Sequence, residues 1–147
     1  MAEAYFIDTN IIMYARGKEH PYRESCSLIL LKIADGSFQD VYGTPVVDTE
    51  VFQEILYRYG MEQRWTVALS VCRDLMAIGV ELLPVGMKEI EALLDITEKY
   101  AGQRISPRDL VHAAVMAANG IGNIITADTH FDLIGEIRRI DPGEVTW

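Results

Sequence analysis

Short apolar segments alternate with longer amphipathic segments along this chain. The short segments are rich in the β-branched residues that favour strands, and the long ones repeat apolar residues at helical spacing. Strands that alternate with helices are typical of a parallel sheet with helices on both faces. The sequence therefore predicts an α/β fold, with strands expected over 4–7, 41–42, 80–85, 123–126 and 138–140.

Capping residues predict where the helices begin and end. Gly36, Gly60 and Gly79 each follow an amphipathic segment, and glycine is the usual residue at the left-handed position that ends a helix. Thr44 and Pro45 resemble an N-cap followed by a proline in the first turn, so a helix is expected to begin there. The predicted helices cover 10–15, 21–34, 44–59, 61–78, 88–100 and 106–119, with a helical turn over 131–134.

The size and composition of the chain fit one globular domain. Its 147 residues are 50% hydrophobic, which is enough for a core, and no linker rich in Pro, Gly or Ser divides them. We therefore expect a single domain over 1–147. The formal net charge of −9 argues against a protein that coats nucleic acid with a basic surface. It does not argue against an enzyme that reaches phosphates through a bound metal and a few arginines.

Several features indicate a protein of the cytoplasm. The first residues lack the basic segment of a signal peptide and lead directly into a strand. The longest nearly uncharged run, 110–127, is interrupted by polar residues and glycines, so it predicts a buried helix, a turn and a strand rather than a membrane span. Cys26 and Cys72 show no metal-ligand spacing, and we expect buried thiols in a reducing compartment.

Four acidic residues, Asp8, Glu54, Asp109 and Asp128, lie at the boundaries or margins of apolar segments. A carboxylate in apolar surroundings is costly unless it is paired or bound to a metal. Asp8 follows the first strand, Asp128 follows a later strand, and Asp109 lies in the first turn of a helix. Because ligands of parallel α/β sheets bind at the carboxyl ends of the strands, these three acids should converge. Together with Glu54 they would form an all-oxygen site for a hard divalent cation.

Each acid also has an ordinary structural interpretation. Asp8 could simply cap the helix that follows it. Glu54 lies at the margin of its helix's apolar stripe and could pair with Arg58 on an exposed flank. Asp109 could complete a capping box with Ser106, and the fourth acid could belong to a turn. A cap and a metal ligand are not exclusive, so both interpretations stay open for Asp109.

Other polar residues lie near these acids in the sequence. Thr126 could hydrogen-bond a carboxylate and orient it. Arg104 and Arg108 could hold the phosphates of a substrate, although Arg108 could also pair with a neighbouring acid. The histidines show no ligand spacing to one another, but His112 and His130 could line a site.

Taken in order, four motifs of this chain resemble those of the PIN domain family. They are Asp8-Thr9-Asn10, Glu54 with Ile55-Leu56-Tyr57, Asp109 at the start of an alanine-rich helix, and Thr126-x-Asp128-x-x-Phe131-Asp132. Each motif alone is nonspecific, but the four in this order cover almost the whole chain. The resemblance implies a three-layer α/β/α sandwich with a mainly parallel central sheet.

The resemblance also implies a ribonuclease that depends on Mg²⁺ or Mn²⁺. It implies that the catalytic and metal-binding acids are Asp8, Glu54, Asp109 and Asp128. Asp132 matches a position that is often acidic and peripheral to the metal, and Asn10 matches a polar position near the site. Members often have a small residue before the second acid, where this chain has Gln53, so Glu50 stays open as an alternative to Glu54.

The compact length resembles the toxin component of VapBC-type toxin–antitoxin pairs, which implies an RNA substrate and an antitoxin protein as partners. The family commonly forms homodimers, and the segment 61–78 carries more apolar surface than a peripheral helix needs, so we expect it near a dimer interface. The alternatives are a PIN domain of RNA processing and a non-catalytic RNA- or protein-binding module. A haloacid-dehalogenase-like phosphatase is disfavoured because it needs an aspartate where Asn10 stands.

Overall fold

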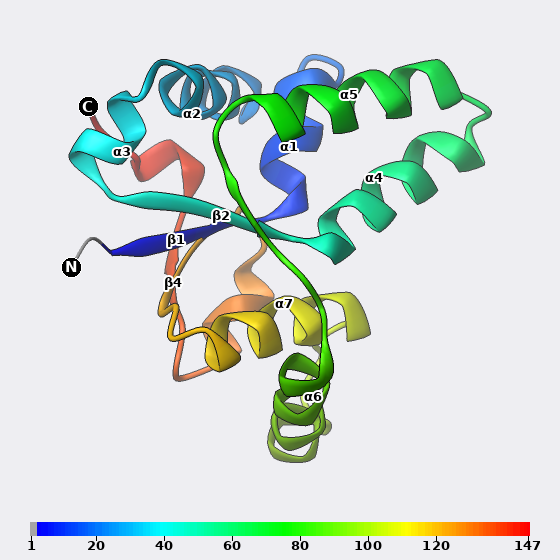
Figure 1. The fold of residues 1–147 in the computed structure, drawn as a ribbon, viewed down its shortest axis with the longest axis vertical. Coiled ribbons are helices and arrows are strands. Elements are labelled where there is room, and N and C mark those ends of the chain that lie inside the picture. The colour runs from blue at the N-terminus through cyan, green and yellow to red at the C-terminus, as the bar shows by residue number, and fades with distance from the viewer. Residues whose placement is uncertain (1–2) are drawn as a thin grey trace.

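A computed structural model describes residues 3–147 and contains a five-stranded sheet in which the neighbouring strands pair in parallel (Figure 1). The strand order is β3-β2-β1-β4-β5, so the first strand lies at the centre. This confirms the predicted α/β fold. The strands are β1 (Ala4–Ile7), β2 (Thr44–Asp48), β3 (Glu81–Leu83), β4 (Asn123–Ile125) and β5 (Arg138–Ile140).

Helices cover both faces of the sheet, as expected for a three-layer sandwich. In Figure 1 the helices α1, α2 and α5 lie above the sheet, whereas α6 and α7 lie below it. The connection from β3, at one edge of the sheet, to β4, on the other side of the central strand, contains the helices α6 and α7. These two helices therefore cover the face opposite to α1, α2 and α5. The helices are α1 (Thr9–Arg16), α2 (Arg23–Asp35), α3 (Ser37–Val41), α4 (Thr49–Met61), α5 (Trp65–Ala77), α6 (Met87–Tyr100) and α7 (Pro107–Ala118), and the 3₁₀ helices are η1 (Thr129–Leu133) and η2 (Pro142–Glu144).

The prediction of a helix beginning at Thr44 was wrong. Residues Thr44–Asp48 form the strand β2, and Pro45 lies opposite Tyr5 of β1. Val46 and Val47 are buried between neighbouring strands, and β-branched residues suit that position better than the first turn of a helix. The helix begins five residues later, at Thr49, with Asp48 as its cap.

The predicted strand at Val41–Tyr42 was also wrong. Val41 ends the helix α3, and Tyr42 follows it in a helical conformation. Tyr42 is held there by aromatic contacts with Tyr5 and Phe38, whose ring centroids lie 5.5 and 5.2 Å away. The contact with Tyr5 joins segments distant in sequence, so local propensity did not reveal it.

The helices α4 and α5 form an antiparallel pair that extends beyond the sheet on the right of Figure 1. The turn between them includes Gln63, which has a positive φ of 58°. Gly60 lets the chain fold back closely, because a Cβ at this position would lie 2.3 Å from the Trp65 ring. The single helix expected over 61–78 is therefore shorter and begins at Trp65.

The core is formed by the sheet and the inner faces of its helices. Phe6, Ile7, Ile124 and Ile125 of the two central strands are fully buried, and Phe131 of η1 is buried with them. The strands β1 and β4 pair in parallel, so both end at the same edge of the sheet. The polar residues that follow the two strands therefore lie together at that edge.

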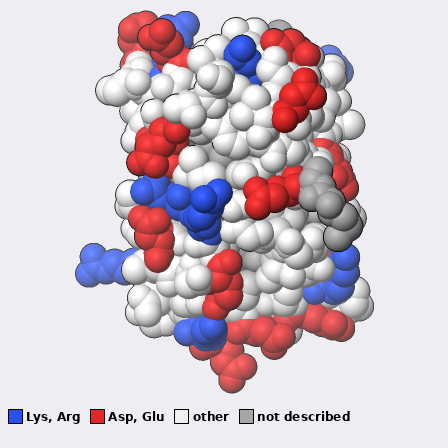
Figure 2. Space-filling model, turned by 90° about the vertical axis from the view of Figure 1, so that its left-hand side faces the viewer, with Lys and Arg blue, Asp and Glu red and all other residues white. Residues whose placement is uncertain are grey.

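Within residues 3–147, no helix is long and apolar enough to cross a membrane. Figure 2 views the molecule from the left of Figure 1, the side on which β1 begins. Acidic and basic side chains are interspersed on this face, and no continuous basic stripe runs across it. This face therefore lacks the broad basic surface of a protein that coats nucleic acid.

Candidate active site

Three aspartates occupy the carboxyl ends of adjacent strands. Asp8 follows β1, Asp48 ends β2, and Asp128 lies three residues after the end of β4. The backbone N–H of Asp8 donates to the carbonyl of Ile125 at 3.1 Å, which joins the ends of β1 and β4. The parallel arrangement thus brings acids from distant parts of the sequence to one edge of the sheet.

Asp8 is buried and held on both of its oxygens. Its Oδ1 accepts a hydrogen bond from the Thr9 N–H at 2.7 Å, so Asp8 is the cap of α1. Its Oδ2 accepts from the Thr126 hydroxyl at 2.7 Å and from the Asn10 amide at 3.2 Å. Burial raises the pKa of this carboxyl, although the positive charge of His112 and these hydrogen bonds oppose the increase.

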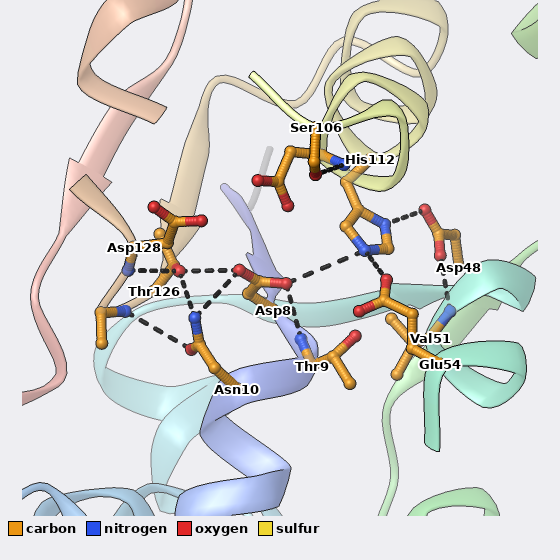
Figure 3. Close-up of polar contacts among 12 residues, drawn as sticks. Asp8, Thr9, Asn10, Asp48, Val51, Glu54, Ser106, His112, Thr126 and Asp128 are labelled. Carbon is orange, nitrogen blue, oxygen red and sulfur yellow. Dashed lines mark hydrogen bonds and ion pairs between the residues drawn. The ribbon is translucent and has the colours of Figure 1, made fainter. Parts of the chain in front are cut away.

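Thr126 connects Asp8 with two other residues of the site (Figure 3). Its side-chain oxygen donates to Asp8 and accepts from the Asn10 amide at 2.9 Å and from the Asp128 backbone N–H at 3.0 Å. The predicted hydrogen bond from Thr126 to a carboxylate is therefore present. Because Thr126 is fully buried, it fixes Asp8 and the start of the following loop relative to each other.

Asp109 and Asp128 line the same cavity, and each carboxyl group shifts the pKa of the other. Burial and the negative charges of Asp8 and Asp128 raise the pKa of Asp109 to about 7. The pKa of Asp128 is lowered, because hydrogen bonds from the backbone and side chain of His130 and the interaction with Asp109 outweigh its burial. Asp109 is thus the member of the pair that holds a proton near neutral pH. Its own N–H donates to the Ser106 side chain at 3.2 Å, so the predicted cap at Ser106 is present too.

Glu54 lies next to a buried histidine. Its Oε1 is 2.6 Å from Nε2 of His112, and Nδ1 of the same ring is 2.7 Å from Oδ2 of Asp48 (Figure 3). Nε2 also lies 3.8 Å from Oδ1 of Asp8. Burial disfavours the charged ring, but the hydrogen bonds that His112 donates to Asp48 and Glu54, together with the nearby negative charges, outweigh it and raise the pKa of His112 well above its usual value. His112 is therefore a positively charged residue among acids.

A cavity of about 490 Å³ connects these carboxylates with a rim of basic side chains. Asp8, Glu54, Asp109 and Asp128 all line it, so the four acids picked out from the sequence lie around one space. Glu19 and Glu62 also line the cavity, and Glu62 pairs with Arg64 at 3.4 Å. Basic side chains beside buried carboxylates suit a polyanion that binds through a cation. The basic residues that line the cavity are Lys18, Arg58, Arg64 and Arg108, and the aromatic residues are Tyr14, Tyr59 and His20.

The chemistry of the donor set fits a hard divalent cation. The four acids offer only oxygen ligands, and burial together with repulsion from Asp8 and Asp128 raises the pKa of Asp109, a cost that a cation would relieve. As the side chains stand, no three His, Cys, Asp or Glu residues within 3–147 are placed to hold a metal ion. In this arrangement one oxygen of Glu54 contacts His112 and one oxygen of Asp128 contacts His130.

The remaining predicted residues lie at different distances from the cavity. Arg108 lines it and stacks over Tyr57, with 5.3 Å between the guanidinium carbon and the ring centroid. Arg104 is exposed and is not among the described residues that line the cavity. Asp132 points away and pairs with Arg139 at 3.0 Å. Glu50 is half-buried near Glu54, and within the described chain only Glu54 of the two lines the cavity.

Sequence reasoning missed Asp48 and underestimated His112. Asp48 was predicted to lie inside a helix. The available signal was its position directly after Val46-Val47, just as Asp8 directly follows Phe6-Ile7. His112 lies one turn after Asp109 on a helix without further charges, which was the available signal. Lys18 was also missed, because it lies in a turn whose position depends on tertiary packing.

The chain is similar to known proteins over almost its whole length. The PIN domain family profile matches residues 5–137. Ribonuclease VapC13 of Mycobacterium tuberculosis is 31% identical over 134 residues, which cover 91% of this chain and 97% of that protein. Ribonuclease VapC23 of the same species is 30% identical and covers 84% of this chain and 91% of its own.

Solved structures share the fold at low sequence identity. VapBC2 from Rickettsia felis, bound to a promoter DNA fragment, has a TM-score of 0.73 at 19% identity and covers 94% of this chain and 98% of its own. VapC20 from M. tuberculosis, a Sarcin-Ricin loop cleaving toxin, has a TM-score of 0.71 at 14% identity and covers 89% and 95%. The profile match, the sequence relatives and the shared fold agree, and this chain belongs to the PIN domain family.

Proposed function

We propose that this protein is a divalent-metal-dependent endoribonuclease and the toxin of a VapBC-type toxin–antitoxin pair. The observation that carries the proposal is the convergence of Asp8, Glu54, Asp109 and Asp128 on one cavity with a basic rim. The names of the sequence relatives, which are VapC ribonucleases, support the same activity. We further propose that the whole chain, 1–147, acts as a single nuclease domain.

Mg²⁺ or Mn²⁺ would be held by the four acids, with Asp8 at the centre. A bound divalent ion supplies positive charge for the scissile phosphate and an acidified water for hydrolysis. The protein's own contribution is orientation. Thr126 and Asn10 fix one oxygen of Asp8, and the Thr9 N–H fixes the other, so this carboxylate cannot rotate away from the cavity. Burial and the charges of Asp8 and Asp128 raise the pKa of Asp109 to about 7, and a cation held by these acids would favour the ionised form of Asp109.

The basic rim gives the RNA backbone a place to bind. Lys18, Arg58 and Arg108 line the cavity together with the acids, so their charges can hold the phosphates that flank the cleaved bond. Arg108 is kept in place by Tyr57. Arg104 is exposed beyond this cavity and would contact only a longer substrate. The few basic side chains at the rim explain how an acidic protein can act on RNA.

An antitoxin is the proposed protein partner. Several of the solved structures with this fold are VapBC complexes, including those from Rickettsia felis and Salmonella typhimurium that hold DNA. We also propose a symmetric homodimer in which α4 and α5 contribute to the interface. Trp65, Leu69 and Met76 of α5 are exposed, although α5 buries Ala68, Val71 and Leu75 against the core. Exposed apolar residues on one helix are typical of a contact surface.

Induced expression in a bacterial host tests the proposed function. We expect the wild-type chain to arrest growth and to produce discrete RNA cleavage sites, which sequencing of RNA 5′ ends detects. The Asp8→Asn protein, expressed to the same level, should do neither, because it lacks the central carboxylate. Growth arrest by Asp8→Asn as strong as that by the wild type would contradict the proposal.

A further inference from the structure

We propose that His112, held by Asp48, is a positioning residue that fixes the carboxylate of Glu54 beside Asp8 in the metal site. The inference rests on the metal-dependent function proposed above and adds two residues to it. Asp48 and His112 are fully buried, and neither is among the described residues that line the cavity. They therefore act through Glu54 rather than by touching a substrate.

Both nitrogens of the His112 ring are engaged by carboxylates. The contacts are 2.7 Å from Nδ1 to Asp48 and 2.6 Å from Nε2 to Glu54. An ionised carboxylate can only accept hydrogen bonds, so this geometry places an N–H on each side of the ring. The ring plane is fixed by Phe6, whose centroid lies 5.0 Å away. His112 thus has one orientation, and Glu54 meets a donor at a fixed point.

Asp48 is itself held by the start of α4. Its Oδ1 accepts from the Val51 N–H at 3.1 Å, and its Oδ2 contacts His112. Asp48 caps α4, Glu54 belongs to α4, and His112 belongs to α7. The three hydrogen-bonded residues therefore join the start of α4 to α7. It sets the position of α7, which also carries Asp109, relative to the carboxylate of Glu54.

The ion pair has a direct consequence for Glu54. Its Oε1 accepts a hydrogen bond from His112, and Oε2 remains available on the side of the cavity. A glutamate side chain has three rotatable torsions, and a short charge-assisted hydrogen bond removes most of that freedom. Asp8 lies farther from the same nitrogen of His112, at 3.8 Å, and its shorter side chain is held by Thr9 and Thr126.

A purely structural ion pair between α4 and α7 is the competing explanation. Buried ion pairs add little stability compared with apolar packing, so stability alone does not account for this one. The two explanations differ in what Asp48 should do. If the pair is structural, loss of Asp48 lowers only stability. If His112 positions Glu54, loss of Asp48 also weakens metal binding, although Asp48 cannot touch the metal site itself.

The test measures Mn²⁺ affinity by calorimetry and the kinetics of RNA cleavage for the full-length chain. Asp48→Asn keeps the side-chain oxygen that caps α4 but removes the acceptor at Nδ1 of His112. We expect its Mn²⁺ dissociation constant to rise about 5-fold or more, as for loss of a residue that orients a metal ligand. We also expect kcat to fall and KM to change little.

Two further comparisons make the result specific. In a Glu54→Gln background, Asp48→Asn should cause no additional loss of Mn²⁺ affinity, because the two residues act in series. Asp141→Asn is the matched control, since Asp141 is another capping aspartate with side-chain partners but lies outside the described cavity lining. It should lower thermal stability without changing Mn²⁺ affinity.

The inference would be overturned if the wild-type protein binds Mn²⁺ and cleaves RNA and Asp48→Asn changes neither the Mn²⁺ affinity nor kcat. That result would leave the proposed function standing. Additive losses in the double variant would also overturn it. Wild-type protein that neither binds Mn²⁺ nor cleaves RNA would contradict the proposed function and this inference with it. His112→Gln serves as a second variant, with the same expected loss of affinity, and Asp48→Asn decides the matter if His112→Gln does not fold.

Discussion

Asp109 and Asp128 line the same cavity with opposite pKa shifts, raised for Asp109 and lowered for Asp128, so Asp109 is the one that holds a proton. Two carboxyl groups in this relationship cannot both be ionised at low cost without a cation between or beside them. The metal-free protein therefore keeps a proton where the metal-bound protein would keep a positive ion.

This relationship predicts how the stability of the metal-free protein depends on pH. The folded-state pKa of Asp109 is raised from 3.8 to about 7, so the stabilising protonated form is fully present below the unfolded value and lost as pH rises towards 7. We expect the melting temperature in chelator to fall between about pH 4 and pH 7. Asp109→Asn should flatten this decline, and an unchanged slope would count against the raised pKa.

Asp128→Asn is expected to separate activity from stability. Asparagine keeps the side-chain oxygen that caps η1, and the removal of one negative charge beside Asp109 offsets the weaker contact with His130, so the metal-free protein should melt at about the same temperature. Cleavage of RNA should fall by about 100-fold or more, because a metal-binding carboxylate is lost. Calorimetric melting and a fluorogenic RNA assay measure the two effects, and loss of both stability and activity would favour a purely structural role.

Thr126→Val tests the orientation of Asp8. Valine has almost the same shape but cannot donate to Asp8 or accept from Asn10 and the Asp128 N–H. We expect a loss of about 1–3 kcal/mol in the free energy of unfolding and a decrease of about 10-fold in activity. Thr66→Val, at an exposed position of α5, is the control and should change neither quantity.

The proposed dimer predicts the effect of a charge on the exposed side of α5. Trp65 is 52% exposed and packs its inner edge against Gly60. Trp65→Glu should convert a dimer of twice 16.5 kDa into a monomer in sedimentation experiments at micromolar concentration. Leu94→Glu changes a residue of α6 that is 65% exposed and should leave the mass unaltered. A wild-type protein that sediments as a monomer would refute the dimer.

Much of the fold could be predicted from the sequence, because its patterns are local. The strands at Ala4–Ile7 and Asn123–Ile125, and the helices over Arg23–Asp35 and Pro107–Ala118, lie close to their predicted positions. The errors arose where tertiary contacts outweigh local signals. Pro45 looks like the start of a helix, but it lies in a strand because the valines that follow it are buried between neighbouring strands.

The candidate site could be predicted in part for a topological reason. Parallel strands bring their carboxyl ends together, so Asp8 and Asp128 converge whatever the details of packing. The partner of Glu54 could not be predicted in the same way. His112 and Asp48 are 64 residues apart and meet only after α4 and α7 have packed together.

The central claim is that the four converging acids form a metal-dependent ribonuclease site. A titration of Mg²⁺ or Mn²⁺ into chelator-treated protein, followed by cleavage of a single-stranded RNA, tests it most directly. We expect no cleavage in chelator, full recovery on addition of the ion, and no recovery at any ion concentration for Asp8→Asn. Full activity of the wild-type protein in excess chelator, or metal-dependent cleavage by Asp8→Asn at the wild-type rate, would contradict the claim.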